Sequence, residues 1–358
     1  MVTARGAAPV SARSRRATVA GVVVTVVVAA VGLIWAKWEP YLGKAFAAAR
    51  THEWTGKDIL AVGGVQAGDA PSWHAATTFF SAYLGAIWPA LVVALVLSAC
   101  VQALLPRTWP SRVMNRRSPL SSAAVGGVAG TPSMMCACCS APVAVTLRRS
   151  GVNLAGAVAF WLGNPLLNPA VLVFLALVAP WQWTVTRLVV GVGTVVGGAA
   201  LVAFVARREA ISEPPDVEPA AEGVPESPAV VRFAWALLRL CVVLVPEYLV
   251  LVLVIGAARG WLLELVDPGH RGLLLVVLAA VVGTLMVIPT AGEIPILQGL
   301  ALLGVSTGVL GALLITLPAV SLPGIAMVAR SFGRRATCAT AAVVVAAGLV
   351  GGFVLSVL

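Results

Sequence analysis

The chain has 358 residues, of which 60% are hydrophobic and only 11% are charged. This composition excludes an ordinary soluble domain and predicts an all-α polytopic membrane protein whose main partner is the lipid bilayer. The formal net charge of +10 does not indicate nucleic-acid binding, because the arginines lie in short clusters between apolar runs. We therefore expect no nucleic-acid partner, and we expect no cofactor.

The N-terminal region, residues 1–76, is predicted to be an anchor helix followed by an external loop. The apolar run 17–36 is long for a signal peptide and no small-residue cleavage site follows it, which favours a retained helix. Residues 37–76 are polar enough for an extramembrane loop. This region is additional to the two halves described next.

The remainder is predicted to form two transmembrane halves, 77–206 and 233–358, joined by a cytoplasmic linker at 207–232. Residues 211–228 hold five acids and five prolines, a composition that buries little and stays extended. Apolar runs long enough to cross a bilayer occur at 77–105, 152–179 and 188–206, and again at 233–258, 305–329 and 336–358.

One apolar stretch in the first half, Gly130 to Gly151, reads GTPSMMCACCSAPVAVTLRRSG. Proline removes a backbone donor and clashes with the preceding turn, so helix breaks are expected near Pro132 and Pro142. A broken backbone at membrane depth is tolerated only inside protein or beside a water-filled cavity. The stretch is therefore predicted to line a transport site.

A related stretch occurs in the second half, 153 residues later. Eight of the 36 positions from Gly130 to Pro165 are identical at this shift, among them Pro142, which matches Pro295. Broken segments at corresponding places of two halves indicate a transporter binding site. The expected hairpin and helix-break positions are Gly130, Pro132, Pro142, Gly151, Pro165, Pro289, Pro295, Gly304 and Pro318.

The distribution of lysine and arginine favours a re-entrant hairpin over a full crossing at each broken segment. With hairpins and a cytoplasmic N-terminus, 16 basic residues lie inside and 7 lie in external loops, among them Lys37, Arg187 and Arg259, while Arg239 lies in the membrane. Full crossings give 14 inside and 9 outside. Each half then has three spans plus one hairpin, so the halves form inverted repeats whose tips meet near the midplane.

The first tip carries three clustered cysteines, Cys136, Cys138 and Cys139. Ser140 is a plausible helix N-cap before Pro142, and a half-helix starting there favours thiolates near its positive end. Three sulfurs can bind a soft metal ion such as Cu(I) or a trivalent metalloid. The alternative is that the cysteines only allow close packing, which is what we expect of Cys100, Cys241 and Cys338.

The second tip carries Glu293 at the position that corresponds to Ser140. A carboxylate inside the membrane is a functional candidate, either as a proton carrier or as a cation ligand, and the alternative is a helix-capping role. Four polar residues accompany the prolines of the following spans and can satisfy freed carbonyls or contact the solute. They are Asn164, Asn168, Thr316 and Ser321.

The pattern T-P-x-x-x-C-x-C, followed by P-V and by L-R-R-x-G, resembles a predicted-permease family that includes bacterial organoarsenical exporters. In this chain the pattern spans Thr131 to Gly151, and the spacing to Asn164-Pro165 is also similar. The family pattern usually has Cys-Ser-Cys where this chain has Cys136-Ala137-Cys138, and Cys139 is an addition. The resemblance extends from about Thr77 to the C-terminus and implies a permease that acts in efflux.

We therefore expect a secondary transporter rather than an enzyme, in the plasma (inner) membrane, with several spans and a cytoplasmic N-terminus. Its cargo would be a small solute, such as a thiol-reactive metalloid or soft metal species. The alternatives are a membrane thiol-redox protein using the cysteine cluster, or a partner subunit that does not transport. Assembly with a second copy or a partner subunit stays open. No phosphate-binding loop of the form G-x-x-x-x-G-K-[ST] is present to power the chain with ATP.

Overall fold

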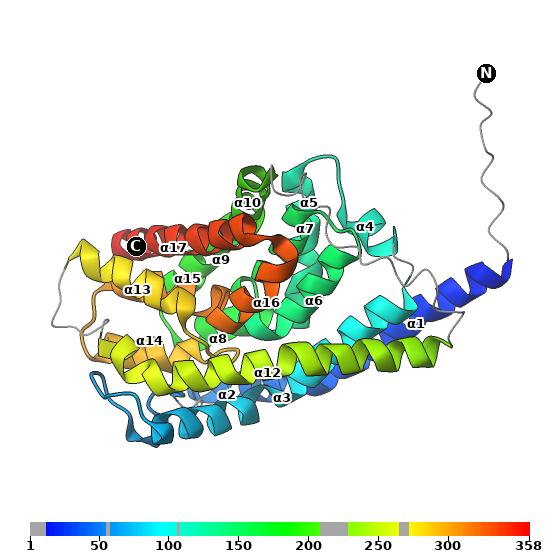
Figure 1. The fold of residues 1–358 in the computed structure, drawn as a ribbon. Coiled ribbons are helices and arrows are strands. Elements are labelled where there is room, and N and C mark those ends of the chain that lie inside the picture. Colours follow the sequence, from blue (N-terminus) through cyan, green and yellow to red (C-terminus); the bar gives the residue numbers. More distant parts are fainter. Residues whose placement is uncertain (1–11, 55–57, 106–107, 208–227, 265–271) are drawn as a thin grey trace.

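The computed structural model describes residues 12–54, 58–105, 108–207, 228–264 and 272–358. Within these ranges the regular structure is helical throughout, which confirms the predicted all-α class (Figure 1). Most of the predicted linker, residues 208–227, lies outside the described part of the chain.

Six of the described helical segments are long and apolar enough to cross a membrane, or up to seven if one bent helix pair counts as a span. The bent pair consists of α15 and α16, which meet at 53°. The six segments are Val19–Thr51, Trp73–Leu104, Leu154–Val178, Trp181–Val205, Ala229–Glu264 and Arg334–Val357. The two predicted hairpins are not among them.

The N-terminal helix is longer than predicted. It runs without interruption through α1 (Ala12–Leu33), a π-helical turn η1 (Ile34–Trp38) and α2 (Glu39–Thr51). The prediction of an external loop from Lys37 onward is therefore wrong for residues 37–51. The physical reason is that Lys37 is buried against protein instead of standing in a loop, so its charge does not mark the end of the apolar helix.

After this helix, the same order of elements occurs twice. A long helix comes first, then a pair of shorter helices, then a broken helix, then a final span. In the first half these are α3 (Trp73–Leu104), α5 (Pro119–Gly130) with α6 (Ala137–Arg149), α7 (Leu154–Leu166) with α8 (Pro169–Val178), and α9 (Trp181–Val192) continuing through η4 (Gly193–Gly198) into α10 (Ala199–Val205). In the second they are α12 (Ala229–Glu264), α13 (Leu273–Leu285) with α14 (Glu293–Leu302), α15 (Thr307–Ala319) with α16 (Leu322–Phe332), and α17 (Arg334–Val357). A short helix, α4 (Thr108–Met114), precedes α5.

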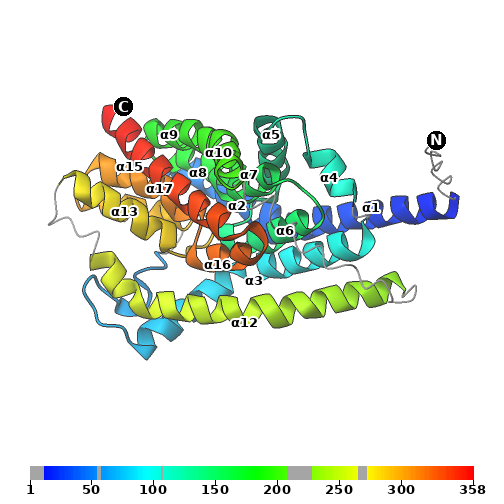
Figure 2. The ribbon, with the colours of Figure 1, turned by 45° about the horizontal axis from the view of Figure 1, so that its top comes forward.

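The two long helices, α3 and α12, lie side by side and antiparallel. Near one end Arg259 of α12 donates to the Ala75 carbonyl of α3 at 2.6 Å, and near the other Arg232 donates to the Ala103 carbonyl at 2.9 Å. Figure 1 places the α5–α6 pair and the α13–α14 pair toward opposite ends of these helices, and Figure 2 shows the same for α5, α6 and α13. Arg259, predicted in an external loop, is instead fully buried, because α12 continues to Glu264.

The sequence repeat has a counterpart in the backbone. Gly151 and Gly304, which match at the 153-residue shift, both have positive φ, 86° and 78°. At each, the following valine donates to the carbonyl five residues earlier, Leu147 or Leu300, both at 3.1 Å. This hydrogen bond belongs to the Schellman motif that ends many helices at a glycine. Both hairpins thus finish in the same way.

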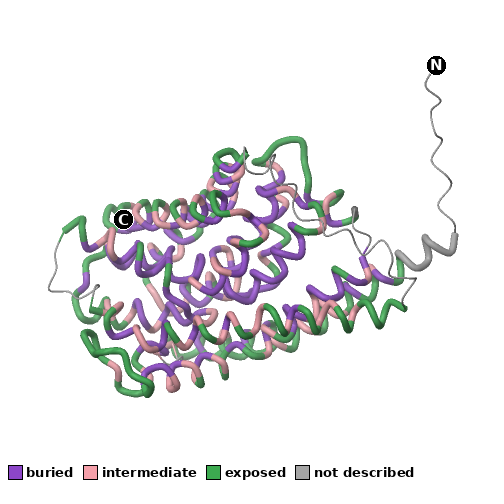
Figure 3. The backbone as a smooth tube through the Cα atoms, in the orientation of Figure 1, coloured by how far each residue is buried: buried purple, intermediate pink, exposed green. Residues whose placement is uncertain are grey.

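In each half, a glycine of the first hairpin helix lies against the broken helix that comes next in the chain. A Cβ at Gly130 would collide with the Phe160 carbonyl of α7, and one at Gly283 would collide with Thr316 of α15. Such contacts hold the hairpins close to the broken helices. Figure 3 shows buried residues concentrated where these elements meet, whereas α1 and α12 carry many exposed residues.

Candidate functional site

The first tip is the break between α5 and α6. A 3-10 turn (Thr131–Ser133) follows Gly130, residues 134–136 are irregular, and α6 begins at Ala137. Pro132 lies in this turn, as predicted, but Pro142 lies inside α6 and does not break it. Cys136 rather than Ser140 is the N-cap residue. The helix starts earlier than predicted because it accommodates Pro142 at the loss of one backbone hydrogen bond.

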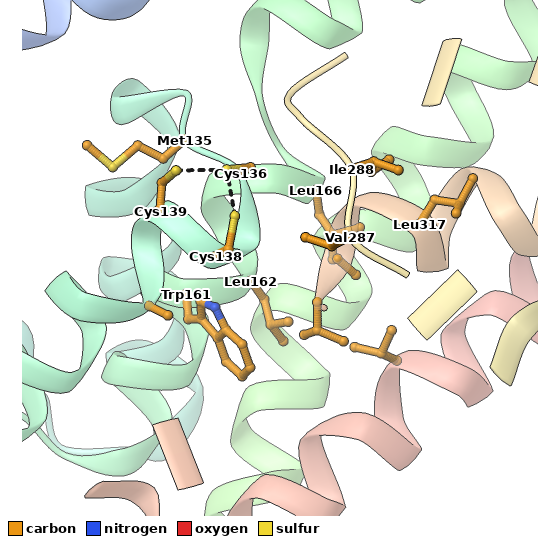
Figure 4. Close-up of a cluster of buried hydrophobic side chains, with 14 of the residues drawn as sticks. Met135, Cys136, Cys138, Cys139, Trp161, Leu162, Leu166, Val287, Ile288 and Leu317 are labelled. Carbon is orange, nitrogen blue, oxygen red and sulfur yellow. Dashed lines mark hydrogen bonds between the residues drawn. The ribbon is translucent and has the colours of Figure 1, made fainter. Parts of the chain in front are cut away.

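The three cysteines of this tip form a compact sulfur cluster. The Cys136 sulfur lies 3.0 Å from the Cys138 sulfur and 3.0 Å from the Cys139 sulfur, and all three lie within 4.8 Å of one another (Figure 4). All three side chains are buried and none forms a disulfide. A three-sulfur arrangement at a helix N-terminus has the donor set that soft ions prefer.

Two tyrosines hold the cluster from opposite halves of the chain. The Tyr83 hydroxyl of α3 lies 3.0 Å from the Cys138 sulfur, and the Tyr248 hydroxyl of α12 donates to the same sulfur at 3.5 Å. Both tyrosines are almost completely buried, and their rings are 6.3 Å apart. The sequence analysis missed both residues. The sequence did contain a signal for them. The chain has only three tyrosines, and two of them lie within apolar runs, where a hydroxyl needs a polar partner.

The polar residues predicted beside the first tip form hydrogen bonds within the tip and between the tip and α7. Asn164 accepts a hydrogen bond from the Ser133 hydroxyl and donates to the Phe160 carbonyl at 2.7 Å. Ser140 donates back to the carbonyls of Cys136 and Ala137, so its hydroxyl is satisfied within α6. Asn164 therefore fixes the tip to α7, and Ser140 does not cap the helix as predicted.

The second tip is the break between α13 and α14. Residues 286–289 are extended, a turn follows at 290–292, and α14 begins at Glu293. Gly292 is the N-cap residue, so Glu293 is the first residue of the helix rather than its cap, and Pro295 is the third. Ala291 has positive φ here, as Met134 does in the first tip. Each tip thus holds one non-glycine residue in the left-handed region, which is uncommon.

Glu293 forms a buried ion pair with a residue that the sequence analysis placed in an external loop. Its Oε1 lies 2.7 Å from Nη1 of Arg187 in α9, and both side chains are almost fully buried. Arg187 also donates to the Pro165 carbonyl at 2.8 Å and the Leu166 carbonyl at 3.3 Å. These carbonyls lie at the end of α7 where the helix breaks, so Arg187 performs a role expected of the asparagines. The second carboxylate oxygen of Glu293 has no hydrogen-bond partner among the residues that the structure describes.

The two tips line one small cavity. Its volume is about 10 Å³, which is room for about one water molecule. Cys136 comes from the first tip, and Glu293 with the extended backbone before it comes from the second. The lining residues are Cys136, Pro165, Val171, Ile288, Pro289, Thr290, Glu293 and Pro318.

The remaining predicted residues lie at the second break of each half. Asn168 and Ser321, which match at the 153-residue shift, are the N-cap residues of α8 and α16, and their side chains accept from the helix backbone. Thr316 donates to the Ala312 carbonyl inside α15 and faces Gly283. These three residues shape the broken helices, and the cavity lining does not include them.

The N-terminal helix touches both tips. The Lys37 ammonium donates to the Thr290 hydroxyl of the second tip at 3.0 Å and to the Tyr41 hydroxyl at 3.3 Å. One residue on, Trp38 donates to the Pro132 carbonyl of the first tip at 3.2 Å. These contacts start from a π-helical turn, a feature that often occurs at functional sites. The sequence analysis missed them because it placed Lys37 in a loop.

A second cavity, of about 340 Å³, lies on the other side of the second tip. Its lining is mainly aliphatic and includes Met286, Leu313 and Leu317, with Asp58 and Gln66 from the segment after the N-terminal helix. Met286 lines this cavity and Ile288 lines the small one. The two cavities are therefore neighbours on one extended segment.

Comparison with known proteins identifies the family. Residues 72–357 match the model of a family described as predicted permease. The chain is also 43% identical over 328 residues to UPF0718 protein YraQ of Escherichia coli (strain K12), which covers 90% of this chain and 92% of that protein. No solved structure matches the chain. With its membrane-spanning helices and this match, the chain belongs to the predicted-permease family and is a membrane transport protein.

Proposed function

We propose that this permease is a secondary transporter that exports a small thiol-reactive solute, a soft metal ion or metalloid species, through a site between its two tips. The observation that carries the proposal is the small cavity that both tips line, with the Cys136 thiol on one side and the Glu293 carboxylate on the other. Sites at which broken segments from two halves meet are typical of secondary transporters.

The two halves are proposed to be inverted repeats. The antiparallel contact of α3 and α12 and the position of the two hairpins toward opposite ends support this arrangement. The cytoplasmic side is proposed to carry the N-terminus and the first hairpin, in the inner membrane, because that orientation keeps most arginines inside. Three of the seven basic residues counted outside, Lys37, Arg187 and Arg259, are buried. Leaving out these three, together with the buried Arg148 from the inside count, strengthens the inside bias.

Transport requires that the site opens to each side in turn. The small cavity has room for about one water molecule. The aliphatic cavity beside the second tip extends to Asp58 and Gln66, and it is proposed as the exit route. Movement of the extended segment that includes Met286 and Ile288 would join the two cavities. An export cycle then loads the thiols from the cytoplasm and releases the cargo through the aliphatic cavity.

Glu293 is proposed to couple this cycle to protons. Protonation of its carboxylate removes the charge that holds Arg187, and loss of this ion pair frees the second tip from α9. Loss of one charge from a buried ion pair leaves the other charge buried without a partner, which is strongly destabilising. Protonation of Glu293 therefore favours a movement of the second tip. The unpaired carboxylate oxygen is the atom that can receive the proton.

The first test is cargo binding by the cysteines. The purified native chain should retain metal or metalloid after gel filtration under reducing conditions, and a variant with Cys136, Cys138 and Cys139 all replaced by serine should retain none. Cys138→Ser alone should abolish transport at normal expression, since its sulfur is held by both tyrosines. Cys338→Ser, at an exposed position, should be silent. Equal, mild effects of the two single changes would refute the proposal.

A further inference from the structure

Lys37 is a buried cation whose hydrogen-bond partners are neutral. Its side chain is 5% exposed, and the partners of its ammonium are the hydroxyls of Tyr41 and Thr290. Among the described residues no carboxylate forms an ion pair with it, since Glu293 pairs with Arg187 and Glu247 with Arg330. An ionised group within a membrane protein is costly and marks a functional site by default.

The charges around the two tips do not balance. Arg187 and Glu293 cancel each other, so Lys37 leaves one positive charge at the site. Thr290, to which the Lys37 ammonium donates, lines the small cavity together with Cys136, so the charge of Lys37 lies beside the sulfur cluster. Its attachment to the second tip, and that of Trp38 to the first, make the N-terminal helix a third wall of the site.

We propose that Lys37 is a cargo-site residue that favours cargo leaving the sulfur cluster negatively charged, and that the cargo is a soft monovalent cation of the Cu(I) class. This inference rests on the proposed function of the cysteines as ligands. When Cu(I) binds three thiols, three protons leave, three copper–sulfur bonds form, and the complex carries a charge of two minus with no change of oxidation state. Lys37 and the hydroxyls of Tyr83 and Tyr248 then face an anionic sulfur cluster.

A trivalent metalloid places a different demand on the site. Arsenite, as As(OH)₃, exchanges its three hydroxyls for three sulfurs and releases three waters, so the complex is neutral. Lys37 would then remain without a counter-charge, and the two tyrosine hydroxyls would face neutral sulfurs. The three sulfurs alone can bind either class of cargo. The charge of Lys37 favours the cargo whose complex with the sulfurs is negatively charged.

Lys37 also lies outside the part of the chain that the family model matches, which begins at residue 72. The cysteines, Arg187 and Glu293 lie within it. The charge preference is thus a property that the N-terminal helix adds to the matched permease core, and replacing one side chain on that helix tests it without changing the core.

The test measures two probes on the purified full chain in detergent, under reducing and anaerobic conditions. Cu(I) affinity is measured by competition with a coloured chelator, and arsenite affinity by bound arsenic after gel filtration. Lys37→Met should weaken Cu(I) binding on the order of tenfold or more, the effect of removing one nearby charge in a medium of low polarity, and should leave arsenite binding unchanged. Lys37→Arg should restore Cu(I) binding. Lys44→Met is the matched control, because this exposed lysine of the same helix also lies over the Tyr41 ring, at 5.7 Å, and it should alter neither affinity.

Lys37→Gln guards against a folding defect, because it removes the charge and keeps a hydrogen-bond donor for Thr290. If Lys37→Gln weakens Cu(I) and arsenite binding equally, Lys37 only supports the fold. If it changes neither affinity, the charge of Lys37 has no effect on cargo binding. Each result would overturn the inference. Native protein that binds arsenite but not Cu(I) would also overturn it while leaving the proposed function intact. If the triple cysteine variant binds both probes as the native chain does, the proposed function itself fails.

Discussion

The two tips share a backbone and differ in chemistry. Both follow a glycine that lets a hairpin helix approach the next span, both contain one non-glycine residue with positive φ, and both hairpins end in the same glycine-centred motif. The first tip, however, carries three thiols held by two tyrosines, whereas the second carries a carboxylate held by Arg187 from the other half. The duplicated backbone thus forms the site, and the two tips contribute different groups to it. The first tip contributes soft ligands, and the second contributes a carboxylate whose charge can change.

The sharpest way to break this division is to remove the charge from the second tip. Glu293→Gln keeps the shape of the side chain but cannot take up and release a proton. Gradient-driven accumulation of cargo in vesicles should vanish, while cargo binding and cargo exchange survive. The matched control is Glu247→Gln, because Glu247 forms an ion pair at a partly exposed site with Arg330 and should transport normally. Uphill transport by Glu293→Gln at several pH values would rule out Glu293 as the carrier of the coupling proton.

The second way to test the comparison is to ask from which side each hairpin is accessible. Arg148 is buried, so the exposed Arg116 and Arg149 are better probes for the ends of the first hairpin. Single cysteines there should resist an impermeant thiol reagent added outside and react after the cells are permeabilised. Single cysteines at Leu273 and Leu303, which are 77% and 72% exposed, should react without permeabilisation.

Labelling of all four positions from one side would contradict the inverted arrangement. Labelling of one member of a pair and not the other would mean that this segment crosses the membrane. The measurement is made in a background without the native cysteines, so it reports topology and does not depend on cargo binding.

The smallest expected effects concern the shared backbone. Gly130→Ala should destabilise the protein by about 1–3 kcal/mol, because the added methyl meets the Phe160 backbone, which cannot move aside. Gly283→Ala should cost less, because the added methyl meets the Thr316 side chain. Gly299→Ala is the control, since no atom lies within 4 Å of the new methyl, and alanine is the better helix former. Thermal unfolding in detergent should rank the three, and equal losses at all three sites would refute the close-contact argument.

The sequence predicted the tips well because prolines and glycines act locally. Pro132 and Pro289 lie in the breaks, and Gly151 and Gly304 end the hairpins, for reasons of backbone geometry that act within a few residues. The exact helix starts were less predictable. Ser140 was predicted to be an N-cap, and the same role was an alternative for Glu293. Ser140 instead lies in α6, which begins at Ala137, and Glu293 is the first residue of α14.

The residues that the sequence analysis missed act across long distances in the chain. Lys37, Arg187 and Arg259 were assigned to loops because a charge next to an apolar run normally marks its end. Each is instead buried against groups contributed by distant segments, such as Thr290, Glu293 and Ala75. Periodicity and composition do not reveal such pairings, whereas the burial of the chain's three tyrosines around the tips was open to inference from their rarity.

The contact between Lys37 and Thr290 has a consequence for how the protein is made. The two residues are 253 positions apart, so at a synthesis rate of about 5–20 residues per second Lys37 leaves the ribosome roughly 13–50 s before its partner exists. During this interval its ammonium sits in a newly inserted helix and reaches toward the headgroups to stay hydrated. The contacts of this helix with the first half, such as that of Trp38 with Pro132, can form earlier, whereas its contact with the second tip forms only after Thr290 has been made. The wall that Lys37 forms against the second tip is thus completed late in synthesis, after most of the chain has been made.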